Sequence, residues 1–303
     1  MSGGVSRRAS LSLNSLWGAS LARVLFRTLL NLIIVVLLGG FAAAALVRYS
    51  PGFDVDENSW NPQISASTLA AMHARREEQN RLPRFYANYL LAALHGDLGQ
   101  SNSLRVPVTD LLRDRAPVTA RLVGWGTAGG LTLGAALAWL AVWPRKRPAN
   151  LLAAGTSGIL VAIPPAVLGL AFYFSEAPLG LAVALAVVPR VFGTMRALFH
   201  ELYSSTSLLA ARARGVGPLT LAARYVLAAA APQLIALLGV ALVLAFGSVI
   251  PIEALCDVPG LGQLAWKAAL ARDLPLLSGL ALIITFVAAS VQAFGDILTG
   301  EGR

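Results

Sequence analysis

Long uncharged runs of apolar residues constrain this chain more than any other feature. Five of them are close to or above the roughly 20 residues that cross the hydrocarbon core of a bilayer as a helix. They cover residues 28–47, 122–143, 151–175, 225–250 and 274–295. A sixth run, 177–195, contains Arg190, which lies six residues before Arg196 and can reach the same membrane interface. We therefore expect an all-α fold, a polytopic membrane helix bundle with about six transmembrane helices.

The composition agrees with a membrane protein. Of 303 residues, 56% are hydrophobic and 13% are charged, and the mean hydropathy is +0.68. Soluble domains contain about a quarter charged residues. The single cysteine, Cys256, excludes an internal disulfide framework.

The distribution of cations predicts that both termini face the cytoplasm. With the N-terminus inside, the inner segments contain Arg7, Arg8, Arg23, Arg27, Arg145, Lys146, Arg147, Arg190, Arg196, Arg212, Arg214, Arg224 and Arg303. Their acidic residues are only Glu201, Asp296 and Glu301. This asymmetry follows the positive-inside rule and accounts for the net charge of +9 without nucleic acid as a partner. The first run could instead be a signal peptide, but it exceeds the usual 7 to 15 apolar residues, which favours a membrane anchor.

The segment between the first two runs predicts an extracytoplasmic element. Residues 68–81 and 84–94 carry apolar side chains at helical spacing, typical of amphipathic helices in a solvated cap over the bundle. Residues 96–101 predict a turn, and residues 106–115 an interfacial helix that leads into the second span. We expect a division into residues 1–114, an N-terminal helix with this segment, and residues 115–299, the main membrane domain.

Residues 196–224 form a charged segment between two apolar runs, with a pattern of helix, turn and helix. A helix over 205–214 is too short to be stable alone and needs a surface to pack on. Gly215 can end it in a left-handed conformation, and Ala210, Ala211 and Ala213 permit close approach of a partner. Alternatively, the segment is an interfacial loop whose arginines only obey the positive-inside rule.

Residues 250–273 predict an outer gate element. Pro251 and Pro259 argue against a continuous helix, and residues 261–270 predict a short helix that dips into the bundle. Glu253 could bond the N-terminus of that helix, where free amides and the dipole favour an anion. The alternative is that Glu253 faces water.

Motifs of catalysis are missing from the sequence. It contains no Gly-x-x-x-x-Gly-Lys-Ser/Thr loop for ATP phosphates and no Gly-x-Ser-x-Gly elbow. His73, His95 and His200 are scattered and show no metal-ligand spacing. Gln292 and Asp296 share a helical face near a membrane end, where an interfacial polar pair is favoured over a proton relay. We therefore expect no enzymatic activity, no metal site and no cofactor in this chain.

Several spaced motifs resemble permease subunits of the dipeptide, oligopeptide and nickel class of ABC importers. In the first half these are Ser50-Pro51-Gly52, Tyr89-Leu90, Gly96-Asp97-Leu98-Gly99-x-Ser101, Pro107-Val108 and Ala116-Pro117-x-Thr119. In the second half they are Arg196 to Gly215 with Glu201 and Ala210-Ala211-x-Ala213-Arg214-Gly215, Glu253-x-x-x-x-x-Pro259-Gly260-Leu261-Gly262, Ala271-Arg272-Asp273-x-Pro275, and Asp296. Two departures stand out. Leu209 takes the place of the glutamate in the general importer motif, and residues 175–178 leave a short loop after the third span.

The resemblance implies a type I ABC importer permease fold and an ATP-driven import function, for peptides or a related small solute. It implies ATPase coupling through Ala210, Ala211, Arg212, Arg214 and Gly215, and an extracytoplasmic gate or turn at Glu253, Pro259, Gly260 and Gly262. The implied partners are a second permease subunit, cytoplasmic ATPase subunits that hold ATP and Mg²⁺, an extracytoplasmic solute-binding protein and membrane lipid, in the cell inner membrane.

Two other functions compete with this interpretation. A secondary transporter or channel would need intramembrane ionisable groups, and the five clear runs contain none. A membrane-embedded hydrolase would need a nucleophile and a base, for which the chain offers no candidate pair.

Overall fold

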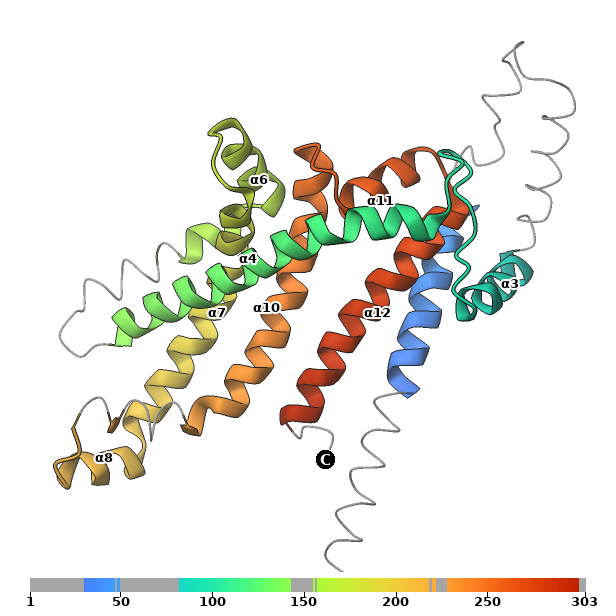
Figure 1. The fold of residues 1–303 in the computed structure, drawn as a ribbon. Coiled ribbons are helices and arrows are strands. Elements are labelled where there is room, and N and C mark those ends of the chain that lie inside the picture. Colours follow the sequence, from blue (N-terminus) through green and yellow to red (C-terminus); the bar gives the residue numbers. More distant parts are fainter. Residues whose placement is uncertain are drawn as a thin grey trace, which may run out of the picture.

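The computed structural model describes residues 30–46, 48–49, 82–142, 155, 157–217, 220–221 and 228–299. Within these ranges the chain is built from helices, with one isolated β-bridge between Gln100 and Pro107. The first helix, Leu30–Leu46, is drawn in blue and unlabelled in Figure 1. The others are α3 (Leu82–Leu94), α4 (Val108–Val142), α6 (Pro165–Phe174), α7 (Leu179–Ser204), α8 (Thr206–Ala213), α10 (Ala228–Leu255), α11 (Leu261–Leu270) and α12 (Leu274–Thr299). An all-α bundle is therefore confirmed for the described residues.

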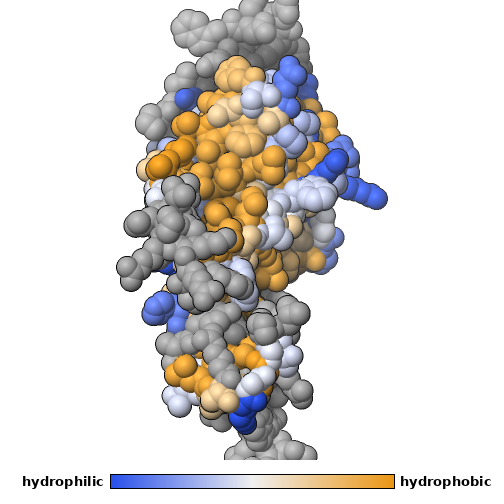
Figure 2. All heavy atoms as spheres, turned by 90° about the vertical axis from the view of Figure 1, so that its left-hand side faces the viewer, coloured by the Kyte–Doolittle hydropathy of each residue, from blue (hydrophilic) through white to orange (hydrophobic). Residues whose placement is uncertain are grey.

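Three of these helices are long and apolar enough to cross a membrane: Leu179–Leu202 of α7, Gln233–Leu255 of α10 and Leu274–Val291 of α12. Leu30–Leu46 and α6 are shorter apolar helices. Residues 122–142 of the second predicted span lie in α4, a 35-residue helix that also contains residues 108–115 of the predicted interfacial helix. The long helices run side by side, with α11 near one end of the bundle and α8 at the other (Figure 1). The face over α4, α6 and α7 is largely hydrophobic (Figure 2), as expected of a surface in contact with lipid or another membrane subunit.

The third predicted span, 151–175, differs from the expectation. Within its described residues, 157–162 are helical. The helix is interrupted at Ile163 and Pro164, and α6 starts at Pro165. Two consecutive prolines explain the break, because Pro164 disfavours helical geometry at Ile163 and Pro165 suits only the first turn of a new helix. The apolar run therefore does not form one continuous helix. The short loop at residues 175–178 is confirmed as the connection between α6 and α7.

The expectation that residues 250–273 form no continuous helix is confirmed, but the break follows Leu255 and does not occur at Pro251. Helix α10 continues through Pro251 to Leu255, and the amide of Cys256 still bonds the carbonyl oxygen of Ile252 at 2.9 Å. A proline removes a single amide donor from a helix, and the following turn re-forms beyond it. This extra turn carries Glu253 toward the start of α11.

Helices α4 and α7 pack along a row of glycines. Gly126, Gly130 and Gly134 lie four residues apart on α4 and face three valines of equal spacing on α7, Val183, Val187 and Val191. A Cβ atom at Gly130 would lie 2.7 Å from the Cβ of Val187. Such spacing of small residues lets two helix backbones approach closely. The core of the bundle therefore rests on a motif that the sequence analysis did not single out.

The segment between the first helix and α4 is described in part. The predicted helix over 84–94 is confirmed as α3, whereas the predicted helix over 68–81 lies outside the described residues. The predicted turn at 96–101 is confirmed, with left-handed conformations at Gly96 and Gly99. Asp273, which is fully buried, ties this turn to the start of α12, since its Oδ2 accepts hydrogen bonds from Ser101 Oγ at 2.6 Å and from the amide of Ser103 at 2.9 Å.

Candidate functional site

Glu253 is the centre of a buried junction at the α11 end of the bundle. Its side chain is fully buried in the last turn of α10. Its Oε2 accepts a hydrogen bond of 2.7 Å from the amide of Gly262, in the first turn of α11. The prediction that Glu253 bonds this helix N-terminus is confirmed, and the alternative that it faces water is wrong. The carboxylate thus satisfies an amide that has no partner within its own helix.

Thr119 of α4 completes the junction. Its hydroxyl donates to Glu253 Oε1 at 2.7 Å and accepts a hydrogen bond from the amide of Leu261 at 2.8 Å. One buried hydroxyl therefore connects three helices, α4, α10 and α11. A hydroxyl suits this position because it donates and accepts at the same time. One signal in the sequence pointed to Thr119, its place in the motif Ala116-Pro117-x-Thr119, but nothing there indicated its partner.

Gly260 and Gly262 are needed for space at this junction. Gly260 has φ −110° and ψ −172°, an extended conformation open to any residue, so its backbone angles do not require a glycine. A Cβ atom at Gly260 would instead collide with the Glu253 carboxylate. A Cβ atom at Gly262 would lie 2.6 Å from the Cα of Ile250. Pro259 lies in the bend before Gly260, where the chain turns from α10 to α11.

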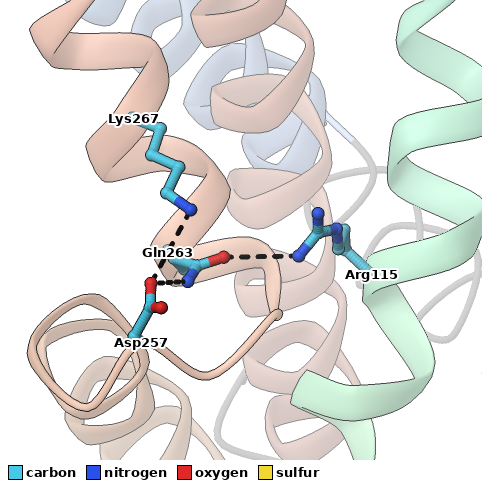
Figure 3. Close-up of polar contacts among 4 residues, drawn as sticks. All are labelled: Arg115, Asp257, Gln263 and Lys267. Atoms are coloured by element: carbon cyan, nitrogen blue, oxygen red, sulfur yellow. Dashed lines mark hydrogen bonds and ion pairs between the residues drawn. The ribbon is translucent and has the colours of Figure 1, made fainter.

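A second polar group, formed by Arg115, Asp257, Gln263 and Lys267, lies next to the junction (Figure 3). Gln263 Oε1 accepts a hydrogen bond from Arg115 Nη1 of α4 at 3.3 Å, and Gln263 Nε2 donates to Asp257 Oδ1. Lys267 Nζ lies 3.7 Å from the same Asp257 oxygen, with both side chains mostly exposed. Exposed ion pairs of this kind contribute little stability. The buried amide of Gln263 links α11 to α4 through Arg115 and to the bend before α11 through Asp257.

Helix α8 forms a separate site at the opposite end of the bundle (Figure 1). The predicted short helix is confirmed as Thr206–Ala213, and Gly215 follows it with φ +77°, the predicted left-handed end. Leu208 and Ala211 are buried in the main core, together with Phe199 of α7. Leu209 is 53% exposed, and Ala210, Ala213 and Arg214 are also exposed.

This orientation corrects one part of the predicted coupling surface. Ala211 packs inward against the bundle and cannot meet a partner, whereas Leu209 on the neighbouring face can. A tryptophan at Ala211 would therefore disrupt the packing of α8 itself. The side chain of Arg212 lies outside the described residues, as do those of Gln292 and Asp296.

The structure brings the predicted gate residues together at one end of the bundle, and the predicted coupling residues lie in or next to α8 at the other end. Among the described residues, no group of three or more His, Cys, Asp or Glu side chains could hold a metal ion. The junction at Glu253 fixes the position of the short helix α11. The site at α8 presents a helix face for contact with another protein.

Comparisons with known proteins agree with this arrangement. Residues 130–300, more than half of the chain, match the family described as binding-protein-dependent transport system inner membrane component. The chain is 25% identical over 293 residues to the nickel import system permease protein NikB of Staphylococcus aureus strain MRSA252, covering 91% of this chain and 89% of that protein. It is 24% identical over 288 residues to NikB of strain USA300, covering 89% and 88%.

The family match contains α6, α7, α8, α10, α11 and α12 complete, and with them Glu253 and the exposed face of α8. It begins at residue 130, within α4, so the predicted boundary at residue 115 stays a prediction. The resemblance to ABC importer permeases is confirmed, and the chain belongs to the family of binding-protein-dependent transport system inner membrane components.

Proposed function

We propose that this chain forms part of the translocation path of an ATP-driven importer for peptides or a related small solute, and that α8 docks on a cytoplasmic ATPase subunit. The observation that carries the proposal is the two-sided packing of α8. Its inner face, Leu208 and Ala211, is fixed to the bundle, and its outer face, around Leu209 and Ala210, is exposed. A helix of eight residues held in this way presents a firm, small surface to a partner.

The exposed face indicates what kind of groove would receive it. Leu209 is an apolar residue at the position where the general importer motif has a glutamate, and Ala210 and Ala213 lie beside it. Arg214 adds one positive charge at the end of the helix. We infer an apolar groove on the ATPase, with an acidic residue near its edge. Association should then depend only weakly on salt, because apolar burial is not screened by ions.

A continuous series of contacts supports coupling between the two ends. Helix α8 packs on the end of α7, α7 packs on α4 through the glycine row, and α4 holds the start of α11 through Thr119. ATP binding on the partner would favour one of two bundle arrangements through differential contacts at α8. Because these helices are closely packed, a shift of α8 would be passed to the gate as a movement of whole helices.

The remaining parts of the proposal concern orientation and partners. Both termini and α8 would face the cytoplasm, and α11 would face the extracytoplasmic side. A second permease subunit would complete the path, and a solute-binding protein would deliver the solute near α11. The chain itself would hydrolyse nothing, and ATP and Mg²⁺ would bind to the ATPase subunits.

The experiment compares two tryptophan variants of α8 in the complex purified from membranes. Ala210→Trp places a large side chain on the exposed face and should prevent ATPase association while the chain still inserts and remains folded. Ala211→Trp is the matched control, which should instead lower the thermal stability of the chain because it overfills the core. Full ATPase association and full coupled ATP hydrolysis by Ala210→Trp would contradict the docking role of α8.

A further inference from the structure

Helix α3 has apolar side chains on both of its faces. Leu82, Tyr86 and Tyr89 are buried against the bundle, yet on the other side Leu91 is 59% exposed and Leu94 is 82% exposed. Its thirteen residues, LPRFYANYLLAAL, include one charged residue, Arg84, and one amide, Asn88. A solvated cap would have a polar outer face, and α3 lacks one over its last turn and a half.

The contacts of Tyr86 place α3 against the side of the bundle. Its hydroxyl donates to the carbonyl oxygen of Leu37 at 2.9 Å and lies so close to Gly40 that a Cβ atom there would collide with it. Leu37 lies nine residues before Leu46, the last residue of the first helix. At a rise of 1.5 Å per residue, Leu37 is about 13 Å from that end of the helix along its axis. Leu282, which also packs at Gly40, lies about 12 Å inward from the start of α12 by the same measure.

The contacts of Tyr89 set the outer limit of this helix. Its hydroxyl lies 3.2 Å from the carbonyl oxygens of Leu98 and Pro275, and Pro275 is the second residue of α12. Burial raises the pKa of both phenols above the usual range, so both hydroxyls remain protonated donors. Helix α3 therefore occupies the outer third to half of the bundle's side, beside the blue helix in Figure 1.

The surface next to α3 is the exposed apolar face of the first helix. Leu30–Leu46 exposes Ile34, Leu38 and Phe41, and Leu38 is 63% exposed. The exposed leucines of α3 continue this apolar surface at the depth of its outer half. Polar residues occur at the edges of α3, with Arg84 near its start and His95 and Asp97 just after its end. Apolar residues at membrane depth with polar residues at the margins are typical of a helix that lies in the bilayer interface.

We propose that α3 lies in the outer boundary of the bilayer, with Leu91 and Leu94 in contact with lipid acyl chains. The occupant of this face is thus membrane lipid. The inference depends on the membrane location of the family and on the contacts of α3, and it does not depend on which solute is carried or on how ATP is used.

A site-directed spin label tests the proposal in the full chain, purified with its co-purifying subunits and reconstituted in phosphatidylethanolamine and phosphatidylglycerol vesicles. Cys256 is buried and is replaced by alanine to remove background labelling. A single nitroxide is then placed at Leu94 or, independently, at Leu91. Leu38 provides the lipid-facing reference, and Asn102, exposed in the turn before α4, provides the aqueous reference.

The measurement is the collision rate of each nitroxide with molecular oxygen, which is enriched in lipid, and with a water-soluble nickel chelate. We expect labels at Leu94 and Leu91 to resemble Leu38, with oxygen collisions exceeding nickel collisions several-fold. A ratio like that of Asn102 would overturn the proposal in favour of a solvated cap. Low collision rates with both reagents would also overturn it, because they would show that protein, either a partner subunit or residues 50–81, covers this face.

Discussion

Thr119→Val is the substitution that isolates the buried junction, because valine keeps the shape of threonine and removes its hydroxyl. The wild-type hydroxyl donates to Glu253 Oε1 and accepts from the Leu261 amide, and both partners are buried. Losing a hydrogen bond to a carboxylate costs about 1.5–3 kcal/mol, and leaving a buried amide without a partner costs about 1–3 kcal/mol. The start of α11 should therefore become less stable by about 3 kcal/mol or more.

Hydrogen exchange measured by mass spectrometry detects this loss of stability separately for each segment of the chain. When reclosing is fast, a loss of about 3 kcal/mol raises the opening equilibrium constant, and with it the exchange rate, about 100-fold, at 1.4 kcal/mol for each factor of ten. Peptides that cover residues 258–270 should lose protection by that factor, and peptides from the middle of α7 should not. Thr119→Ser retains the hydroxyl and should restore most of the protection.

Two outcomes would refute the reasoning. One is unchanged protection of α11 in Thr119→Val. The other is an equal loss of protection in Thr119→Ser, which would show that the methyl group of Thr119 matters and its hydroxyl does not.

Further predictions concern the glycines and the topology. Gly130→Val should lower stability by about 1–3 kcal/mol because it overfills the contact between α4 and α7; Gly124→Val on the same helix, where a Cβ atom would meet open space, should cost less than 1 kcal/mol in a thermal unfolding assay. Gly260→Ala should already impair transport, since its Cβ atom alone meets the Glu253 carboxylate, and normal uptake would show that the junction adapts. A reporter fused after Arg147 should be cytoplasmic and one inserted near Asn61 should be outside, with the opposite labelling contradicting the proposed orientation.

The elements that the sequence predicted well are those whose ends have local signals. Helix α11 was expected over 261–270 and is observed over those residues, because a Pro-Gly pair precedes it and Asp273 and Pro275 follow it. Helix α8 and its left-handed end at Gly215 follow in the same way from the position of one glycine. The hydrogen bond from Gly262 to Glu253 joins residues only nine positions apart, so local reasoning could reach it.

Other features depend on contacts between distant parts of the chain. Thr119 and Glu253 are 134 residues apart, and neither position alone indicates its partner. The direction in which α8 faces was ambiguous because Leu208 and Leu209 are both apolar, and the packing on α7 decides that Leu208 is buried. The glycine row could have been recognised from its spacing of four residues, whereas its valine partners could not.

The most direct test of the proposed function is solute uptake into proteoliposomes that contain the purified complex. With ATP, Mg²⁺ and the solute-binding protein all supplied, we expect uptake of a peptide or related solute, and omission of ATP or of the binding protein should abolish it. A proton gradient without ATP should drive no uptake. Uptake that proceeds without ATP and follows the proton gradient would contradict the proposal and favour a secondary transporter.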